Sequence, residues 1–96
     1  MTDFSRRVYR VVSGIPRGHV LSYAEVAHRA GSPGAARRVG TLMARNPYPK
    51  KQVPCHRVVR SGGYLGNYSG RGGAATKEKL LLAEGVLVIR GKIARA

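Results

Sequence analysis

A chain of 96 residues has room for one domain, and its single cysteine excludes an internal disulfide. No stretch reaches the roughly 20 apolar residues of a transmembrane helix, and the residues after Met1 lack the apolar segment of a secretory signal. We therefore expect an intracellular, reducing compartment. In a prokaryote this compartment is the cytoplasm with its nucleoid. The 18 lysines and arginines against 4 acidic residues give a net charge of +14, which favours nucleic acid as the partner, with rRNA or an acidic membrane surface as alternatives.

The first half of the chain has the sequence pattern of helices. Apolar residues recur at helical spacing over residues 3–13, and the turn over residues 14–18 ends this helix. Ser22 and Glu25 have the spacing of a capping box, so we expect a second helix that begins there and ends at Gly31.

A third helix is expected to follow directly. Ser32-Pro33 supplies a cap residue and then a proline at the first helical position, and Asn46-Pro47 ends the helix. Two short helices joined by a tight turn favour a helix-turn-helix. The apolar face of the third helix consists of Ala36, Val39, Leu42 and Met43.

The second half of the chain is expected to hold shorter elements. The proline-rich residues 47–54 predict an extended loop, residues 57–60 a short strand and residues 66–73 a glycine-rich loop. Residues 77–84 predict a helix, and residues 86–93 a small hairpin or a frayed end. The whole chain is therefore expected to be mainly α with short β pieces, of the helix-turn-helix or winged-helix-like class.

Cys55 is the candidate nucleophile. Lys50, Lys51, His56 and Arg57 surround it in the sequence with groups that carry positive charge, and such surroundings favour the thiolate. The alternative is a buried and inert cysteine, which is the usual role of a lone cysteine.

His56 is the candidate base, but its position next to Cys55 poses a geometric problem. Adjacent side chains of a regular strand point to opposite faces, so contact between the two needs a turn or a bridging water. A relay histidine also needs a group that orients it, commonly a carboxylate. Glu25, Glu78 and Glu84 are the candidates, and their spacing does not choose among them. A phosphate contact is the alternative role of His56.

No metal site and no cofactor site are expected. The chain lacks a CxxC pair, and it lacks a phosphate loop of the type GxxxxGK[ST]. Zinc-site spacing is also missing among the residues that could supply ligands, which are His19, His28, Cys55 and His56.

The helix expected over residues 33–45 has small residues where a major-groove reader carries long polar side chains. A helix of this kind can press close to the minor groove of DNA, and close packing on another helix is the alternative. Arg37 on this helix can enter the base stack. Tyr23 can push on a phosphate or stack on a base, unless it is a half-buried core residue. The small residues are Gly34, Ala35, Gly40, Thr41 and Ala44.

Six motifs in this order resemble those of the O6-alkylguanine-DNA alkyltransferases. Pro54-Cys55-His56-Arg57-Val58 reproduces the active-site motif of that family. The resemblance covers nearly the whole chain and is to the C-terminal, active-site domain, so residues 1–96 would be one such domain without the N-terminal domain of full-length members. The other motifs are Ser22-Tyr23, Ala35-Ala36-Arg37-Arg38-Val39-Gly40, Asn46-Pro47, Gly66-Asn67-Tyr68-Ser69-Gly70, and Lys77-Glu78 leading to Glu84-Gly85.

The resemblance implies catalytic roles for five residues. Cys55 would take the alkyl group from O6 of guanine in a flipped-out nucleotide, and His56 would deprotonate Cys55 through a bridging water. Glu84 would orient His56, and Asn46 would hold the turn that presents the active-site segment. Tyr23 would rotate a phosphate and later donate a proton to the guanine.

The resemblance also implies contacts with DNA and with the lesion. Arg37 would take the place of the flipped base in the stack. The Val53 carbonyl would accept a hydrogen bond from the guanine amine, in a pocket lined also by Asn67, Tyr68 and Ser69. The further DNA-contacting residues would be Ser22, Tyr23, Ala36, Gly40, Thr41 and Arg45.

The implied function is DNA repair by direct reversal, in which each protein molecule is used once. The implied partner is duplex DNA with an O6-alkylguanine, bound by a monomer through the minor groove, with other repair proteins as further partners. A first alternative is an alkyltransferase-like protein, which binds the lesion without transfer and recruits another pathway; the short form and the tail over residues 84–89 are similar to that subfamily. A second is a basic helix-turn-helix regulator or rRNA-binding protein in which Cys55 is structural.

Overall fold

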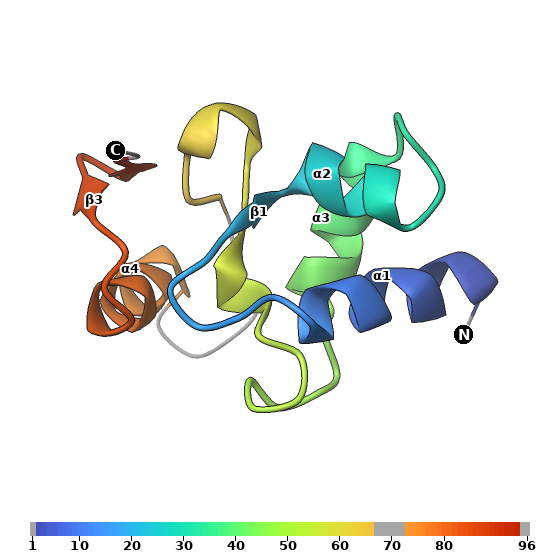
Figure 1. The fold of residues 1–96 in the computed structure, drawn as a ribbon, viewed down its shortest axis with the longest axis horizontal. Coiled ribbons are helices and arrows are strands. Elements are labelled where there is room, and N and C mark those ends of the chain that lie inside the picture. Colours follow the sequence, from blue (N-terminus) through green and yellow to red (C-terminus); the bar gives the residue numbers. More distant parts are fainter. Residues whose placement is uncertain (1, 67–72, 95–96) are drawn as a thin grey trace.

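The computed structural model describes residues 2–66 and 73–94, and its helices gather at two ends of the molecule (Figure 1). The helices α1 (Asp3–Ser13), α2 (Tyr23–Arg29) and α3 (Ala36–Ala44) lie at one end, and α4 (Gly73–Ala83) lies at the other. Two short strands, β1 (Leu21–Ser22) and β2 (Val58–Val59), lie between them. Across the described ranges, none of the helices has the length and apolar character that crossing a membrane requires.

Helix α1 forms over the residues that its apolar spacing predicts. The Thr2 hydroxyl accepts a hydrogen bond from the Ser5 N–H at 3.1 Å and so caps the first turn. The residues Phe4, Val8 and Val12 are buried and share one face, as the helical period of 3.6 residues requires.

The capping box at the start of α2 is confirmed. The Glu25 N–H donates to the Ser22 hydroxyl at 3.0 Å, and the Ser22 N–H donates to the Glu25 carboxylate at 3.0 Å. The helix ends before Gly31, which has the left-handed φ of +85° that a glycine adopts without strain.

Helix α3 begins at Ala36, so the prediction that Ser32-Pro33 begins this helix is wrong. Gly34 has a φ of +95°, which is not a helical conformation. The Ala35 N–H donates to the Ser32 carbonyl at 3.1 Å, and residues 32–35 therefore form a turn that precedes the helix. The helix α2, this turn and α3 form the expected helix-turn-helix, in which the two helices pack on each other.

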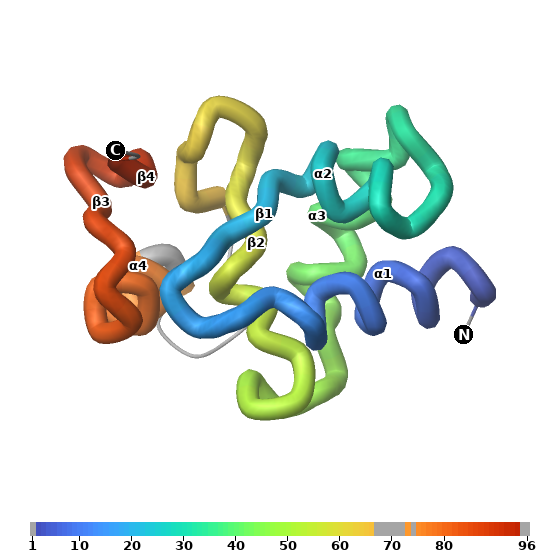
Figure 2. Tube along the Cα trace, viewed as in Figure 1, coloured from blue at the N-terminus to red at the C-terminus, as the bar shows by residue number. Residues whose placement is uncertain are grey.

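The strands β1 and β2 pair in parallel, with Leu21 opposite Val58 and Ser22 opposite Val59 (Figure 2). The strand expected over residues 57–60 is thus only two residues long, and a 3-10 helix, η1 (Cys55–Arg57), precedes it. Since β1 continues directly into α2, this pairing brings the start of α2 beside the end of β2.

The C-terminal part consists of a helix and a hairpin. Helix α4 begins at Gly73, earlier than the expected residue 77, and Gly85 with a φ of +84° follows it. The strands β3 (Val88–Ile89) and β4 (Lys92–Ile93) pair antiparallel, which confirms a hairpin rather than a frayed end. A second 3-10 helix, η2 (Ser61–Gly63), lies between β2 and α4 in the sequence. The expected architecture, mainly α with short β pieces, is confirmed.

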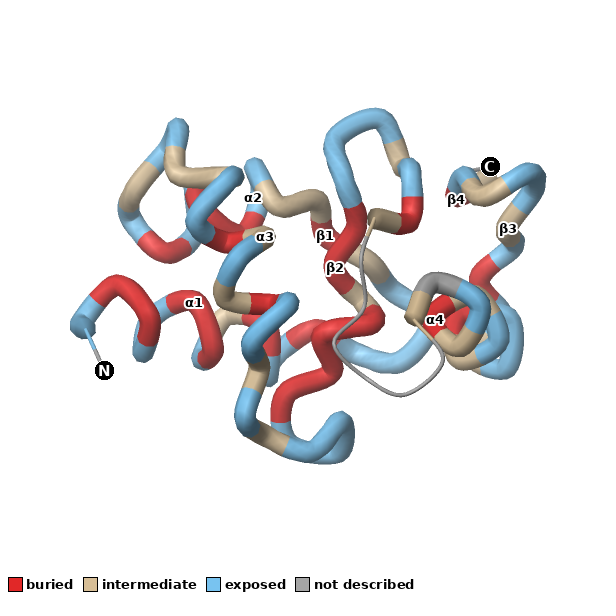
Figure 3. The backbone as a smooth tube through the Cα atoms, turned by 180° about the vertical axis from the view of Figure 1, so that it is seen from behind, coloured by how far each residue is buried: buried red, intermediate tan, exposed pale blue. Residues whose placement is uncertain are grey.

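The buried residues form two clusters, which meet at β2 (Figure 3). Val58 belongs to the larger cluster, beneath α1, α2 and α3, and Val59 belongs to the smaller one, beneath α4 and the hairpin. Successive side chains of a strand point to opposite faces, so β2 can contribute to both. The smaller cluster consists of Val59, Leu65, Leu81, Val86 and Ile93.

We predict that Leu81→Ala lowers the free energy of unfolding by about 3 kcal/mol, because the change leaves a cavity in a small cluster. The Leu81 side chain is 0% exposed, whereas its neighbour Leu82 is 46% exposed. Urea denaturation followed by circular dichroism measures the difference. Leu82→Ala is the matched control, with an expected change below about 0.5 kcal/mol, and equal effects of the two changes would contradict the packing of α4 described here.

Candidate active site

Cys55 follows a tight turn at Pro54, not a regular strand. Pro54 has a φ of −77° and a ψ of 73°, which is the conformation of an inverse γ-turn, and the Cys55 N–H donates to the Val53 carbonyl at 2.8 Å. The 3-10 helix η1 then begins at Cys55, and only 5% of this residue is exposed. Cys55 and His56 therefore lie in one 3-10 helix and do not alternate across a sheet.

Asn46 holds this turn from the other side. Its Nδ2 donates to the Val53 carbonyl at 3.1 Å, and its Oδ1 accepts from the Tyr48 N–H at 3.0 Å. One side chain thus joins the end of the helix-turn-helix to the segment that carries Cys55. The Val53 carbonyl, for which the family resemblance implies a contact with the guanine amine, accepts hydrogen bonds from Asn46 and from the Cys55 backbone.

Glu84 is the carboxylate that reaches His56. The His56 Nε2 lies 2.9 Å from Glu84 Oε2, and both side chains are more than nine-tenths buried. Glu84 directly follows the last turn of α4, where the Arg17 guanidinium donates to the Ala83 carbonyl at 2.8 Å. Glu25, another candidate, forms the capping box of α2 instead.

Arg57 completes a buried ion pair with the same carboxylate. Its Nε donates to Glu84 Oε1 at 2.9 Å, and its Nη2 donates to Glu84 Oε2 at 2.7 Å. Its Nη1 donates to the Ile15 carbonyl at 2.7 Å. Sequence reasoning took Arg57 only as positive charge near the thiol, whereas the structure directs its guanidinium to Glu84.

The electrostatics of this cluster leave His56 a neutral base. Burial alone would raise the pKa of Glu84, but the hydrogen bonds and charges of Arg57 and His56 outweigh it and lower this pKa to about 2. Burial lowers the pKa of His56 below its ordinary 6.5, although Glu84 acts in the opposite direction. A charged Glu84 accepts the Nε2 proton of a neutral His56, so Nδ1 carries the lone pair. Among the described residues, the buried Nδ1 has no hydrogen-bond partner.

Lys77 is a buried residue of the site that sequence reasoning missed. It lies on α4, is 0% exposed, and donates from Nζ to the Val58 carbonyl at 2.6 Å. Burial lowers the pKa of Lys77 from 10.5 to about 8, while the charge of Cys55 acts in the opposite direction. Its position four residues before the buried Leu81, on the same face of α4, is the signal that could have found it.

Six of the seven residues expected to contact DNA line one hollow on α3. Of these residues, Ser22 lies outside the hollow and serves as the cap of α2. Gly40 packs under the ring of Tyr23, since a Cβ at this position would lie 3.5 Å from the ring. The Thr41 hydroxyl donates to the Arg37 carbonyl at 3.3 Å, which turns it toward its own helix. The hollow is lined by Tyr23, Ala36, Arg37, Gly40, Thr41, Ala44, Arg45, Arg60, Ser61 and Gly66.

Sequence reasoning did not include Arg60 in this DNA face. It follows β2 directly. Burial raises the pKa of Tyr23, and the charge of Arg60 acts on this pKa in the opposite direction. The parallel pairing of β1 and β2 creates this neighbourhood, and two-residue strands give little sequence signal. Three predicted pocket residues, Asn67, Tyr68 and Ser69, lie outside the described residues.

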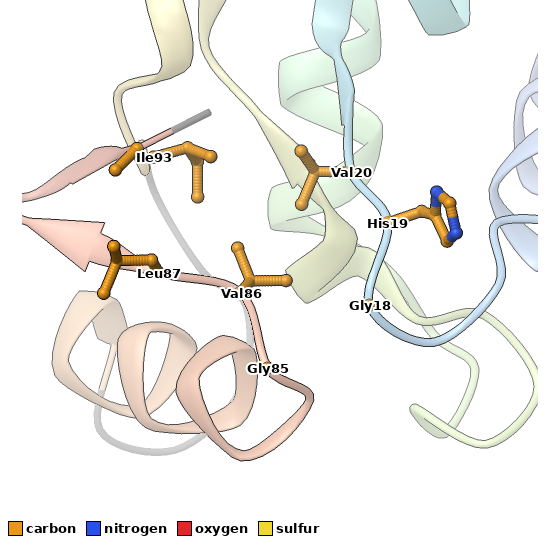
Figure 4. Close-up of a pocket in the computed structure, with 8 residues that line it drawn as sticks. Gly18, His19, Val20, Gly85, Val86, Leu87 and Ile93 are labelled. Carbon is orange, nitrogen blue, oxygen red and sulfur yellow. The ribbon is translucent and has the colours of Figure 1, made fainter. Parts of the chain in front are cut away.

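A second hollow lies between the loop at Gly18 and the start of the hairpin (Figure 4). The side chains of Val20, Val86 and Ile93 face this hollow, and the His19 ring points away from them. None of the candidate catalytic residues lines it. Within the residues that the structure describes, no group of three His, Cys, Asp or Glu side chains could hold a metal ion.

The sequence is similar to those of methylated-DNA–protein-cysteine methyltransferases. A family model described as the DNA-binding domain of 6-O-methylguanine DNA methyltransferase matches residues 3–86. The methylated-DNA–protein-cysteine methyltransferase of Methanothermobacter thermautotrophicus is 51% identical over 85 residues, which cover 88% of this chain and 46% of the relative. The human protein of the same name is 49% identical over 84 residues, which cover 86% of this chain and 39% of the human protein. The chain thus spans less than half the length of these two relatives.

Solved structures with the same fold include two complexes with DNA. The structure of S. pombe Atl1 with damaged DNA containing O6-carboxymethylguanine has a TM-score of 0.82 and 33% identity, and the match covers 100% of this chain and 91% of that one. The structure of Mycobacterium tuberculosis OGT with DNA has a TM-score of 0.81 and 44% identity, over 88% of this chain and 50% of that one. Sequence and fold together show that the chain belongs to the family of the 6-O-methylguanine DNA methyltransferase DNA-binding domain.

Proposed function

We propose that this protein repairs DNA by direct reversal and transfers the alkyl group of an O6-alkylguanine to Cys55. The observation that carries the proposal is the buried Cys55 in one 3-10 turn with His56, whose outer nitrogen is held by Glu84. The name of the curated relatives, which transfer methyl groups from DNA to a protein cysteine, supports it. The product is a thioether, so each molecule is used once.

The reaction uses the three groups in sequence. Glu84 holds the Nε2 proton of His56, and Nδ1 accepts the proton of the Cys55 thiol through a bridging water. The sulfur then attacks the alkyl carbon, a sulfur–carbon bond forms, and the carbon–O6 bond breaks with its electron pair on the guanine. Tyr23 donates a proton to that guanine, which makes it a better leaving group. Asn46 keeps the turn before Cys55 in place.

The substrate is duplex DNA with the lesion flipped out of the stack, bound by a monomer. The small residues of α3 allow a close approach to the minor groove, and Arg37 is exposed on this helix to take the place of the flipped base. The net charge of +14 supports binding to the phosphates and a place on the nucleoid in a prokaryote. Asn67, Tyr68 and Ser69 remain the proposed lining of the lesion pocket, and no cofactor takes part.

A second function is supported by one comparison. The structure of S. pombe Atl1, to which this chain is similar with a TM-score of 0.82, holds damaged DNA containing O6-carboxymethylguanine. In this function the protein would bind the lesion and present it to other repair proteins without transfer. The presence of a cysteine beside the His56–Glu84 pair favours transfer over this alternative.

We predict that the protein gains the mass of one methyl group in place of a proton when it is mixed with a duplex that holds one O6-methylguanine. Cys55 is the expected position, because it directly precedes His56, the proposed base, in the 3-10 helix η1. Intact-protein mass spectrometry, followed by peptide mapping, measures the gain.

Cys55→Ser is the control, which we expect to bind the same duplex without a gain in mass. An unchanged mass of the wild type with lesion-selective binding would contradict transfer and establish the second function. Equal affinity for damaged and undamaged DNA, with a steep dependence on salt, would contradict both.

We predict that the single-turnover rate of transfer falls only at pH values below 6.5. Because burial lowers the pKa of His56, the histidine stays neutral and able to accept a proton down to that range. His56→Asn is expected to lower the rate by about 100-fold or more and to remove this acid limb. A rate that already falls above pH 7 in the wild type would contradict a neutral His56.

We predict that Glu84→Gln lowers the free energy of unfolding by about 3 kcal/mol at pH 7, because Arg57 then loses its buried partner. Because the pKa of Glu84 is lowered, the charged Glu84 makes its full contribution to stability above pH 4.5 and loses it as the pH falls toward 2. The difference between wild type and variant should therefore shrink in denaturation curves at pH 3. Glu78→Gln on α4 is the control, with an expected change below about 0.5 kcal/mol, and a pH-independent difference would contradict the ion pair.

A further inference from the structure

Arg60 has a fixed backbone and an exposed side chain. Its N–H donates to the Tyr64 carbonyl at 2.7 Å, and its own carbonyl accepts from the Gly63 N–H at 3.0 Å. These two hydrogen bonds close the turn around η2, so the backbone position of Arg60 is well defined. Arg60 is one of the residues that line the hollow on α3.

The strand register places Arg60 beside Tyr23. Ser22 and Val59 are opposite each other in the parallel pair of β1 and β2, so the residues that follow them are neighbours. Gly66 provides an independent measure of this approach. A Cβ at Gly66 would lie 2.8 Å from Arg60 Cγ and 2.9 Å from the Tyr23 hydroxyl oxygen. The stem of Arg60 and the Tyr23 hydroxyl therefore approach the same point, over a residue that has no side chain.

The charged groups that face Tyr23 are mostly positive. Lys77 of α4 lies over its ring, with Nζ 5.9 Å from the centroid, and Arg37 and Arg45 of α3 line the same hollow. Among the described residues, no carboxylate lines this hollow, and the nearby Glu25 on α2 forms the capping box. Cys55 acts on Tyr23 from the buried side. Burial raises the pKa of Tyr23, so a negative charge on its oxygen is disfavoured at this position, and the positive charge of Arg60 acts in the opposite direction.

We propose that Arg60 is a positioning residue for Tyr23, and that its guanidinium stabilises the negative charge on the Tyr23 oxygen when the hydroxyl gives its proton to the departing guanine. The inference rests on the proposed function. In this step the sulfur–carbon bond forms, the carbon–O6 bond breaks, and the electron pair of that bond stays with the guanine. The guanine takes the proton of Tyr23, the O–H electron pair stays on the Tyr23 oxygen, and solvent later returns a proton to it.

The experiment measures the single-turnover transfer rate at saturating DNA with an O6-methylguanine, and the DNA affinity separately. Arg60→Gln is expected to lower the saturating rate by about tenfold, and Arg60→Lys to retain most of it, because the charge rather than the shape acts on Tyr23. Arg7→Gln is the matched control on the exposed face of α1, with the same change in net charge and an unchanged saturating rate.

A double-mutant cycle with Tyr23→Phe shows whether Arg60 acts through Tyr23. In the Tyr23→Phe protein, Arg60→Gln should have no further effect on the saturating rate. A further tenfold loss in that protein, or a loss of DNA affinity with an unchanged saturating rate, would overturn the inference while the proposed function stands. If the wild type takes up no methyl group at all, the proposed function fails and this inference fails with it.

Discussion

The carboxylate of Glu84 holds the active-site segment to the rest of the molecule. It accepts hydrogen bonds from His56 and from two nitrogens of Arg57, and Arg57 also binds the Ile15 carbonyl after α1. Taking a carboxylate and a guanidinium out of water costs several kcal/mol for each, so the arrangement is stable only when all of these partners are in place. The same contacts that offset this cost also hold His56 in the orientation that the proposed proton transfer requires. Stability and chemistry therefore depend on one carboxylate.

The two short strands β1 and β2 hold together the hollow on α3, where DNA is proposed to bind. They contribute few hydrogen bonds, but their register sets the end of β1 beside the end of β2, and hence Tyr23 beside Arg60. Tyr23 begins α2 and packs on Gly40 of α3, so the helix-turn-helix and the active-site segment share one tyrosine. The hollow where DNA is proposed to bind and the turn that carries Cys55 are thus parts of one structure.

Local patterns predicted the parts of the fold that depend on local forces. The capping box of Ser22 and Glu25 and the apolar face of α1 are confirmed, because each is decided within a few residues. The predicted start of α3 was wrong. Ser32-Pro33 has the sequence pattern of a helix start, but Gly34 adopts a left-handed conformation. Spacing could not choose Glu84 among the carboxylates, and the family resemblance did. The burial of Lys77 had only its helical spacing from Leu81 as a signal. The partners of Arg57 depend on contacts between segments far apart in the sequence, for which a single chain gives no local signal.

The sequence separation of these contacts also has a consequence for how the chain folds. The helices α2 and α3 follow each other in the sequence and pack on each other, and contacts between such neighbours form quickly. The contacts of the site join pairs of residues that are separated by 27, 28 or 42 positions in the sequence, and the contact of Arg17 with α4 spans 66 positions. Closing loops of this length costs entropy before any contact repays it, so the helix-turn-helix can form ahead of the site. His56 and Glu84, the proposed base and the carboxylate that holds it, are therefore joined across a long loop, whereas α2 and α3 are joined across a short turn.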